Sequence, residues 1–281
     1  MKVFKTVDSL RKWRANLNPE KTLGLVPTMG ALHEGHLSLV RRSKNENDLS
    51  LATIFVNPTQ FDRKEDLDSY PSSLETDLRM LEESGCDAVF IPTPEDIYEN
   101  KIASEPFEFQ GLDKVMEGRF RQGHFDGVAT IVRKLFRITQ PNRAYFGEKD
   151  FQQLQIIKRM VKNQHIPVQV IPCEIYREED GLAMSSRNRR LDAKQREEAI
   201  LLYQTLLNGK EMLKNGAGFE IIHKMADEAF QSNPFLKLEY FEIAESDTLA
   251  PAISYDPSKK YRAFVAAFAG PVRLIDNIAL N

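Results

Sequence analysis

Two glycines and two histidines stand close together in the stretch TMGALHEGH, directly after an apolar run with the composition of a buried strand. The spacing of Gly30 and Gly35 equals that of the glycines in a phosphate-binding P-loop, but His36 and Leu37 follow where that loop has Lys and Ser or Thr. His33 and His36 are three residues apart and have no evident third ligand, which disfavours a catalytic zinc site.

A simpler chemistry fits this stretch. A glycine turn that leads from a strand into a helix leaves the first helical amides without partners, and such amides bind phosphate oxygens. Imidazoles beside them can donate hydrogen bonds to charge that builds on a leaving phosphate. We therefore predict an anion site at residues 28–36, against the alternative of an ordinary turn that contains two imidazoles.

Two further motifs follow strand-like runs. In IFVNPTQF, Gln60 comes just after a proline that ends the strand, so its amide either holds a hydroxyl or carboxylate group or belongs to an ordinary loop. In YFGEKDFQQ, Lys149 follows the glycine turn at Gly147 and is a candidate phosphate ligand. Asp150 suits either a helix N-cap or a contact to ribose or metal.

Two polar segments carry arginine. In GLAMSSRNRRL, Ser185 and Ser186 precede Arg187, a pattern that suits a loop closing on a polyphosphate. In GRFRQGHFDGV, Arg121 and His124 belong either to a basic lid or to the start of a helix, and the sequence leaves both open.

These motifs need elements to position them, and short apolar runs alternate with longer amphipathic ones up to about residue 173. That alternation is typical of βαβ units on a parallel sheet, so we predict an α/β fold with a Rossmann-like N-terminal domain. The expected strands are 22–27, 49–56, 87–92, 143–147 and 168–173, and the expected helices are 35–45, 72–84, 127–139 and 150–163.

Beyond residue 186 the pattern changes to helices followed by strands. Apolar residues recur at helical spacing from 191 until Gly216 and Gly218, and a second helix is expected at 219–232. Strands at 237–245, 261–270 and 272–278 complete a smaller α+β domain. We place the domain boundary so that residues 1–175 bind nucleotide and residues 176–281 form the C-terminal domain.

Composition and charge exclude several classes of protein. The chain has 281 residues and a net charge of -3, so it offers no broad basic surface for nucleic acid. No run approaches the roughly 20 apolar residues of a membrane helix, and the N-terminus lacks a signal-peptide core, so we expect a cytoplasmic protein. Cys86 and Cys173 lack the spacing of a zinc site, and we expect reduced, buried thiols.

Taken together, these motifs resemble those of a known protein family. The motifs PTMGALHEGH, IFVNPTQF, RFRQGHFDGVAT, YFGEKDFQQ and GLAMSSRN occur in the order and spacing of the pantoate–β-alanine ligases, also called pantothenate synthetases. The first and last motifs are also similar to the HxGH and KMSKS-type signatures of the wider nucleotidylyltransferase superfamily, with MSSR in place of the lysine-bearing signature. The resemblance implies a ligase that joins pantoate to β-alanine through a pantoyl adenylate, releasing AMP and diphosphate.

The resemblance also implies roles for particular residues. His33, His36 and Lys149 would be catalytic, with His36 the donor to the departing group. Gln60 and Gln153 would hold pantoate, and Gln60 would also lie close to β-alanine. The implied ATP contacts are Met29, Gly30, Ala31, Leu32, His33, Glu34, Gly35, His36, Gly147, Glu148, Lys149, Asp150, Tyr176, Met184, Ser185, Ser186 and Arg187.

The family also implies magnesium bound with the ATP phosphates, a homodimer, and a C-terminal domain that acts as a lid over the active site. No carboxylate cage for the metal is visible in the sequence, and Asp77 is a weak candidate ligand. Two other functions remain open. A nucleotidylyltransferase would act on a phosphate-bearing acceptor, and a non-catalytic nucleotide-binding module would bind ATP without turnover and would need neither Gln60 nor Lys149.

Overall fold

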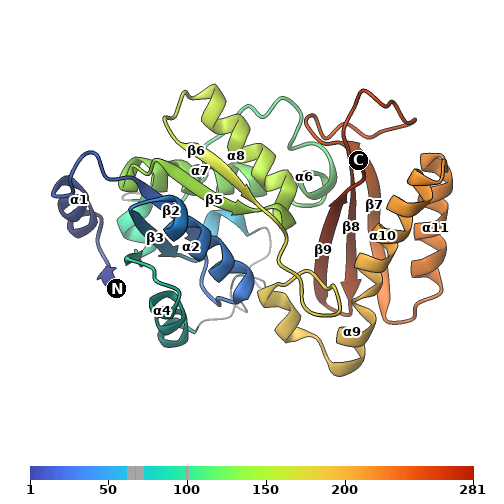
Figure 1. Ribbon diagram of the computed structural model, residues 1–281, viewed down its shortest axis with the longest axis horizontal. Helices are drawn as coiled ribbons and strands as arrows, with labels where there is room; N and C mark the ends of the chain where they lie inside the picture. Colours follow the sequence, from blue (N-terminus) through green and yellow to red (C-terminus); the bar gives the residue numbers. More distant parts are fainter. Residues whose placement is uncertain (62–66, 68–72, 99–100) are drawn as a thin grey trace. The chain divides into compact units, whose positions relative to one another are not determined.

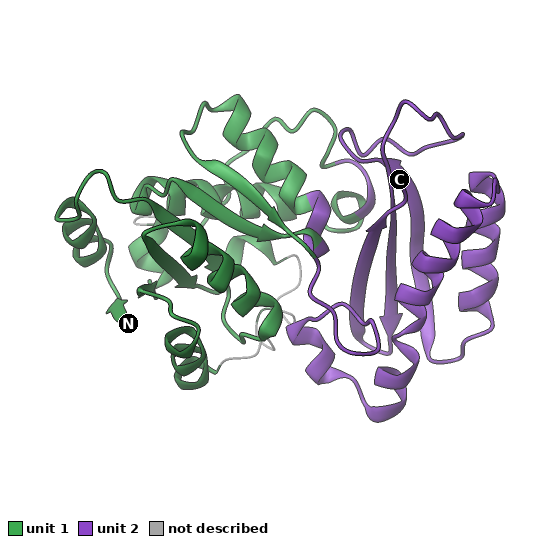
Figure 2. Cartoon of the chain, viewed as in Figure 1, with its two compact units in different colours: residues 1–113, 117–148, 153–174 green, residues 114–116, 149–152, 175–281 purple. Residues whose placement is uncertain are grey.

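The computed structural model describes residues 1–61, 67, 73–98 and 101–281, and these form two compact units (Figures 1 and 2). Unit 1 consists of Met1–Asp113, Glu117–Glu148 and Gln153–Glu174. Unit 2 consists of Lys114–Met116, Lys149–Gln152 and Ile175–Asn281. Unit 2 therefore includes two short segments that the predicted boundary at residue 175 assigns to the N-terminal domain.

Unit 1 contains a parallel sheet of six described strands in the order β1-β4-β3-β2-β5-β6. The strands are β1 (Lys2–Phe4), β2 (Leu23–Thr28), β3 (Leu49–Ile54), β4 (Ala88–Phe90), β5 (Arg143–Gly147) and β6 (Gln169–Cys173). The predicted Rossmann-like α/β fold is confirmed. From β2 the chain first adds β3 and β4 on one side and then returns to add β5 and β6 on the other, so the strand order reverses at β2. In open α/β sheets, ligands bind at the carboxyl ends of the strands where the order reverses.

Helices cover this sheet on both faces, which explains why β2 is buried along nearly its whole length. Figure 1 shows α2 lying across β2, β3 and β5, where Val40 and Leu37 pack on Val26 and Ala52. The helices and short 3-10 turns up to residue 163 are α1 (Val7–Ala15), α2 (Glu34–Glu46), η1 (Pro58–Gln60), α4 (Leu74–Glu83), α5 (Pro94–Tyr98), α6 (Met116–Phe120), α7 (His124–Thr139), η2 (Glu148–Asp150) and α8 (Phe151–Asn163).

The helices predicted up to residue 163 agree with the observed ones apart from their ends, whereas the single helical run expected from residue 191 is divided into α9 (Ala193–Glu198) and α10 (Leu201–Lys214). Residue 72, where the helix at 72–84 was expected to begin, lies outside the described residues. The helix expected from Gly127 starts earlier, at His124. The apolar pattern of the sequence does not predict β1, α1, α5 or α6, which are short or weakly patterned.

Unit 2 is built on an antiparallel sheet of β7 (Leu236–Glu245), β8 (Tyr261–Ala269) and β9 (Val272–Ala279), as the sequence predicted for the three strands. Figure 1 shows α10 (Leu201–Lys214) and α11 (Phe219–Gln231) side by side against it, with Leu206, Ile222 and Val265 in the shared core. The turn η3 (Ser186–Arg190) and α9 (Ala193–Glu198) precede these helices.

Among the described residues, no helix combines the length and the apolar character needed to cross a membrane. Both cysteines are unoxidised and buried, as predicted. Burial raises the pKa of the Cys86 thiol to about 11 and that of the Cys173 thiol to about 11.

These raised pKa values predict inert thiols in the folded protein. At pH 7.5 the thiolate, which is the reactive form, is well below about one part in a thousand for such a group. We expect Ellman's reagent to label neither Cys86 nor Cys173 of the native protein within minutes, and to label both after unfolding in guanidinium chloride. Rapid labelling of either thiol without denaturant would contradict this prediction.

Candidate active site

The loop after β2 turns sharply and is held by a buried carboxylate. Gly30 has φ +81°, and Ala31 also lies in the left-handed region, at φ +50°. Asp77, on α4 and 1% exposed, accepts the Ala31 N–H on Oδ2 and the Leu32 N–H on Oδ1, both at 2.9 Å. Ser73 Oγ donates to the same carboxylate at 3.0 Å. A Cβ at residue 30 would lie 3.1 Å from Asp77 Oδ2, so glycine gives this carboxylate room.

These bonds narrow the predicted anion site. The amides of Ala31 and Leu32 face Asp77, and the Gly30 amide donates to Thr28 Oγ1 at 3.2 Å, so none of the three points toward a phosphate. For the predicted anion site, this leaves the first turn of α2 and its imidazoles. The same bonds disfavour Asp77 as a magnesium ligand, because both of its oxygens already hold the loop.

The two histidines lie together at the start of α2. His33 is the N-cap residue and His36 lies one turn further on, with 4.0 Å between the ring centroids. Both residues are half-buried. Glu34, a predicted ATP contact, is exposed and forms an ion pair with Arg41 at 2.7 Å. Gly35, which precedes His36, is half-buried. The predicted pairing of the imidazoles is thus present in the structure.

Gln60, the predicted ligand of pantoate, lies against this loop. Its Nε2 donates to the sulfur of Met29 at 3.1 Å, and its Oε1 accepts from Asn57 Nδ2 at 3.1 Å. Asn57 is buried and also donates to the carbonyl of Gly127 on α7. The structure therefore brings together two motifs that lie about one βα unit apart in the sequence.

The segment GRFRQGHFDGV includes a helix start, because its second half forms the start of α7 at His124. His124 Nδ1 lies 2.7 Å from the carbonyl oxygen of Gln60, and its Nε2 lies 3.0 Å from Arg121 Nη1. Because guanidinium only donates, Nε2 is the acceptor and Nδ1 carries the proton given to Gln60. Gly127 allows this approach, since a Cβ there would clash with the carbonyl group of Thr59.

The candidate residues of unit 1 share one edge of the sheet. The loop of residues 29–32 follows β2, Asn57 and Gln60 follow β3, and Gly147 and Glu148 end β5 and begin η2. These strands are neighbours in the order β3-β2-β5, so their carboxyl ends open on the same edge. Gln153, in the first turn of α8, is half-buried.

In unit 2, Lys149 and Asp150 lie in η2. The Lys149 side chain is 18% exposed, and its Nζ lies 3.9 Å from a carboxylate oxygen of Asp150. The carbonyl oxygen of Lys149 accepts a hydrogen bond from Asn277 Nδ2 on β9, at 2.9 Å. The main chain of Lys149 is therefore hydrogen-bonded to the sheet of unit 2. The ion pair between its ammonium group and Asp150 is long, at 3.9 Å.

Tyr176 and Met184, both predicted ATP contacts, lie on the two arms of one hairpin in unit 2. The Met184 amide donates to the Tyr176 carbonyl at 3.0 Å, and Arg177 pairs with Ala183 across a bridge. Ser185 caps η3 by accepting the Arg187 N–H at 3.2 Å, and Ser186 is buried while Arg187 is half-buried.

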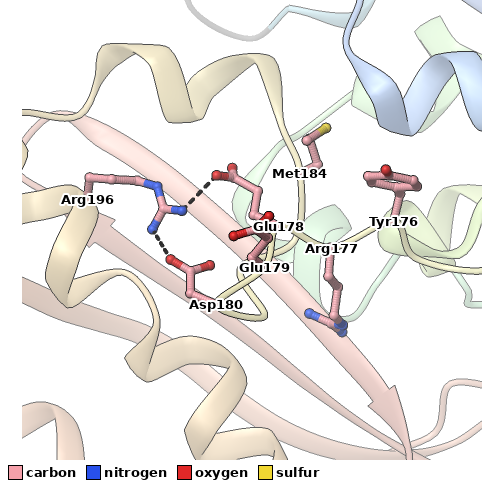
Figure 3. Close-up of a pocket in the computed structure, with 7 residues that line it drawn as sticks. All are labelled: Tyr176, Arg177, Glu178, Glu179, Asp180, Met184 and Arg196. Atoms are coloured by element: carbon pink, nitrogen blue, oxygen red, sulfur yellow. Dashed lines mark hydrogen bonds and ion pairs between the residues drawn. The ribbon is translucent and has the colours of Figure 1, made fainter.

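This hairpin lines a cavity of about 480 Å³ (Figure 3). Figure 3 shows Arg196 pointing toward Glu178 and Asp180, and the structure gives 2.7 Å for each ion pair. Arg196 lowers the pKa of Asp180 through its hydrogen bond. The cavity is lined by Tyr176, Arg177, Glu178, Glu179, Asp180, Met184 and Arg196. Arg196 pairs with two of its carboxylates, and the exposed ring of Tyr176 and the side chain of Met184 provide apolar surface suited to a flat base.

The predicted site residues thus form two sets, one in each unit. Within the described part of the chain, no group of three or more His, Cys, Asp or Glu side chains could hold a metal ion.

Comparison with known proteins agrees with these motifs. The family model described as pantoate-beta-alanine ligase matches residues 2–279. The chain belongs to the pantoate–β-alanine ligase family. Pantothenate synthetase from Christiangramia forsetii is 50% identical over 262 residues, which are 93% of this chain and 92% of the relative.

Solved structures of this family have the same fold. Pantothenate synthetase from Thermus thermophilus gives a TM-score of 0.93 at 41% identity, with 100% of this chain and 99% of that chain covered. Pantoate-beta-alanine ligase from Francisella tularensis, crystallised with beta-gamma ATP and beta-alanine, gives a TM-score of 0.82 at 34% identity, with 100% and 98% covered. Membership of this ligase family favours the ligase prediction over nucleotidylyl transfer and over a non-catalytic binding module.

The motifs of this ligase do not predict the residues that hold the candidate ligands in place. From sequence, Asp77 is a candidate for magnesium rather than for the loop, and no motif includes Asn277. The sequence carries little signal for either, because Asp77 lies in an acidic helix start and Asn277 lies inside an apolar strand. His124 was singled out, but its contact to Gln60 joins residues 64 apart in the chain.

Substitution of Asp77 by Asn tests the role of the carboxylate. An amide has one acceptor oxygen and would turn an N–H group toward one of the two loop amides. We expect Asp77→Asn to reduce the free energy of unfolding by about 2 kcal/mol and to raise the KM for ATP, because a charge-assisted pair of hydrogen bonds is lost. Urea unfolding and initial-rate kinetics measure the two effects.

Ser73→Ala is the matched control for Asp77→Asn. It removes a hydroxyl donor from the same carboxylate and leaves the hydrogen bonds from the Ala31 and Leu32 amides in place. It should therefore reduce the free energy of unfolding by about 1 kcal/mol or less and leave the KM for ATP unchanged. An Asp77→Asn variant as stable as the wild-type protein, with a normal KM for ATP, would show that the carboxylate does not shape the loop.

Proposed function

We propose that this ligase condenses pantoate with β-alanine in two steps on a bound ATP. The chain is a pantoate–β-alanine ligase that forms pantothenate. In the first step a carboxylate oxygen of pantoate attacks the α-phosphorus of ATP, the bond from that phosphorus to the bridging oxygen breaks, and diphosphate leaves. In the second step the β-alanine amine attacks the carbonyl carbon of pantoyl adenylate, loses a proton and displaces AMP.

The contact between the Met29 loop and Gln60 is the observation that carries this proposal. It joins the loop that leads into the first turn of α2, where the imidazoles suit phosphate, with an amide suited to a carboxylate or hydroxyl, at the edge where the strand order reverses. A carboxylate attacking a phosphate needs both kinds of group side by side. Because an in-line displacement requires little covalent help, catalysis rests on positioning and on stabilising the charge of the leaving diphosphate.

The imidazoles and the ammonium group suit that charge. We assign His33, His36 and Lys149 to the phosphates, with His36 as the donor to departing diphosphate. The 4.0 Å between the two histidine rings supports this assignment, since one anion can then contact both. Lys149 supplies a full positive charge on an anchored backbone.

The other site residues take the roles that family membership supports. We assign pantoate to Gln60 and Gln153, and β-alanine to Gln60. The remaining residues of the 29–36 loop and first turn, Gly147, Glu148, Asp150, Tyr176, Met184, Ser185, Ser186 and Arg187 are assigned to ATP. Magnesium would arrive on the ATP phosphates rather than in a protein cage. A homodimer, a cytoplasmic location and a lid role for residues 176–281 remain predictions.

Diphosphate–ATP exchange without β-alanine tests the first step, because it requires pantoate only if pantoyl adenylate forms. We expect exchange that depends on pantoate, and a loss on the order of 10²-fold in His36→Ala and in Lys149→Ala, since each removes a donor to the leaving group. His165→Asn and Lys162→Ala, exposed changes at the end of α8, serve as matched controls and should retain the wild-type rate. Exchange that ignores pantoate would refute the adenylate mechanism.

Gln60→Ala tests the assignment of pantoate. Loss of the amide should raise the KM for pantoate by about tenfold or more and leave the KM for ATP within about threefold, because the lost hydrogen bonds go to one substrate. The exposed Gln164→Ala is the control. Equal losses for pantoate and ATP would show instead that Gln60 supports the Met29 loop.

A further inference from the structure

Asp276 and Asn277 are adjacent polar residues on β9, each 2% exposed. Buried polar groups persist in proteins when their hydrogen bonds are satisfied. Asn277 Nδ2 donates to the carbonyl oxygen of Lys149 at 2.9 Å, and its Oδ1 accepts from Arg262 Nη1. Because a guanidinium only donates, Arg262 fixes the amide with its oxygen toward β8 and its NH2 group toward Lys149.

Arg262 is itself held in place. Its guanidinium lies 4.0 Å from the centroid of the Phe151 ring, and Phe151 packs on Phe264 of β8 with 6.0 Å between ring centroids. Phe151, two residues after Lys149, therefore packs on β8, the same strand whose Arg262 holds the Asn277 amide. The main chain at Lys149 is restrained by a hydrogen bond on its carbonyl and by the packing of Phe151.

The backbone of Asn277 is anchored by its neighbour. Asp276 Oδ1 accepts the Asn277 N–H at 2.7 Å, and the same carboxylate receives Arg177 in a bidentate pair at 2.7 and 3.0 Å. Arg177 lies over the Tyr203 ring, with its Cζ 3.8 Å from the centroid. It directly follows Tyr176 in the chain. One strand thus restrains both the Lys149 segment and the hairpin that begins at Tyr176.

We propose that Asn277 is the positioning residue for Lys149, holding its backbone so that the ammonium group meets the leaving diphosphate. This inference rests on the proposed role of Lys149 in the first step. A lysine side chain is long and flexible, so its charge is placed only as well as its main chain is held. A misplacement of about 1 Å near the reacting atoms can lower a rate by as much as 10²-fold.

Asn277→Asp removes the donor to Lys149 while keeping an acceptor for Arg262, and Asn277→Ala removes both. We expect each to lower the kcat of pantoate-dependent diphosphate–ATP exchange by about tenfold, with the KM values for ATP and pantoate within about threefold of wild type. Rates are compared at a temperature below the unfolding midpoint of every variant, so that only folded protein is measured.

Arg273→Gln is the matched control on the same strand. Arg273 pairs with Glu239 of β7 at a half-buried position, so its loss weakens the sheet of unit 2 without touching Lys149. It should lower the unfolding midpoint and leave the exchange rate within about twofold of wild type.

The double variant Lys149→Ala/Asn277→Asp distinguishes positioning from general stability. If Asn277 acts through Lys149, the double variant exchanges at the rate of Lys149→Ala alone, because coupled residues are not additive. Extra slowing in the Lys149→Ala background, or Asn277 variants as fast as Arg273→Gln, would overturn the positioning role alone. Normal exchange by Lys149→Ala would overturn the role of Lys149 and this inference with it.

Discussion

The carboxylate of Asp77 holds the amides of Ala31 and Leu32, and the geometry of the loop that leads into α2 depends on those two bonds. A carboxylate that is almost fully buried is tolerated when backbone N–H groups satisfy it. The bonds in turn require a chain that turns through positive φ at Gly30 and Ala31. Because α2 begins directly after this turn, the turn sets where His33 and His36 lie at its first turn.

A similar arrangement occurs at Gln60 and Lys149, where a buried polar side chain holds the main chain of a candidate ligand. His124 donates to the carbonyl of Gln60, and Asn277 donates to the carbonyl of Lys149. Anchoring through the backbone has a physical advantage, because the polar atoms of the ligand side chain are not consumed by the anchor. It also removes conformational freedom before the substrate binds, which lowers the entropy lost on binding.

Under the proposed assignment, the positive charge of the site comes from several places in the chain. The first motif has the glycine spacing of a P-loop but no lysine, and the last motif has MSSR without the lysines of the related signature. Lys149 and Arg187 supply ammonium and guanidinium groups from separate segments of unit 2. A displacement at phosphorus that releases diphosphate spreads charge over many oxygens, so donors from several segments suit it better than one point charge.

The sequence by itself determined the fold class, most strands and the candidates for the substrate ligands, because periodicity of apolar residues and short motifs are local properties of the chain. It also determined the family, through five motifs in a set order. Tertiary structure alone decided which groups hold those candidate ligands. Asp77 meets Leu32 across 45 residues and Asn277 meets Lys149 across 128, and no local pattern encodes such pairs. The close approach of Gly127 on α7 to Thr59 in η1 is likewise a contact between distant segments.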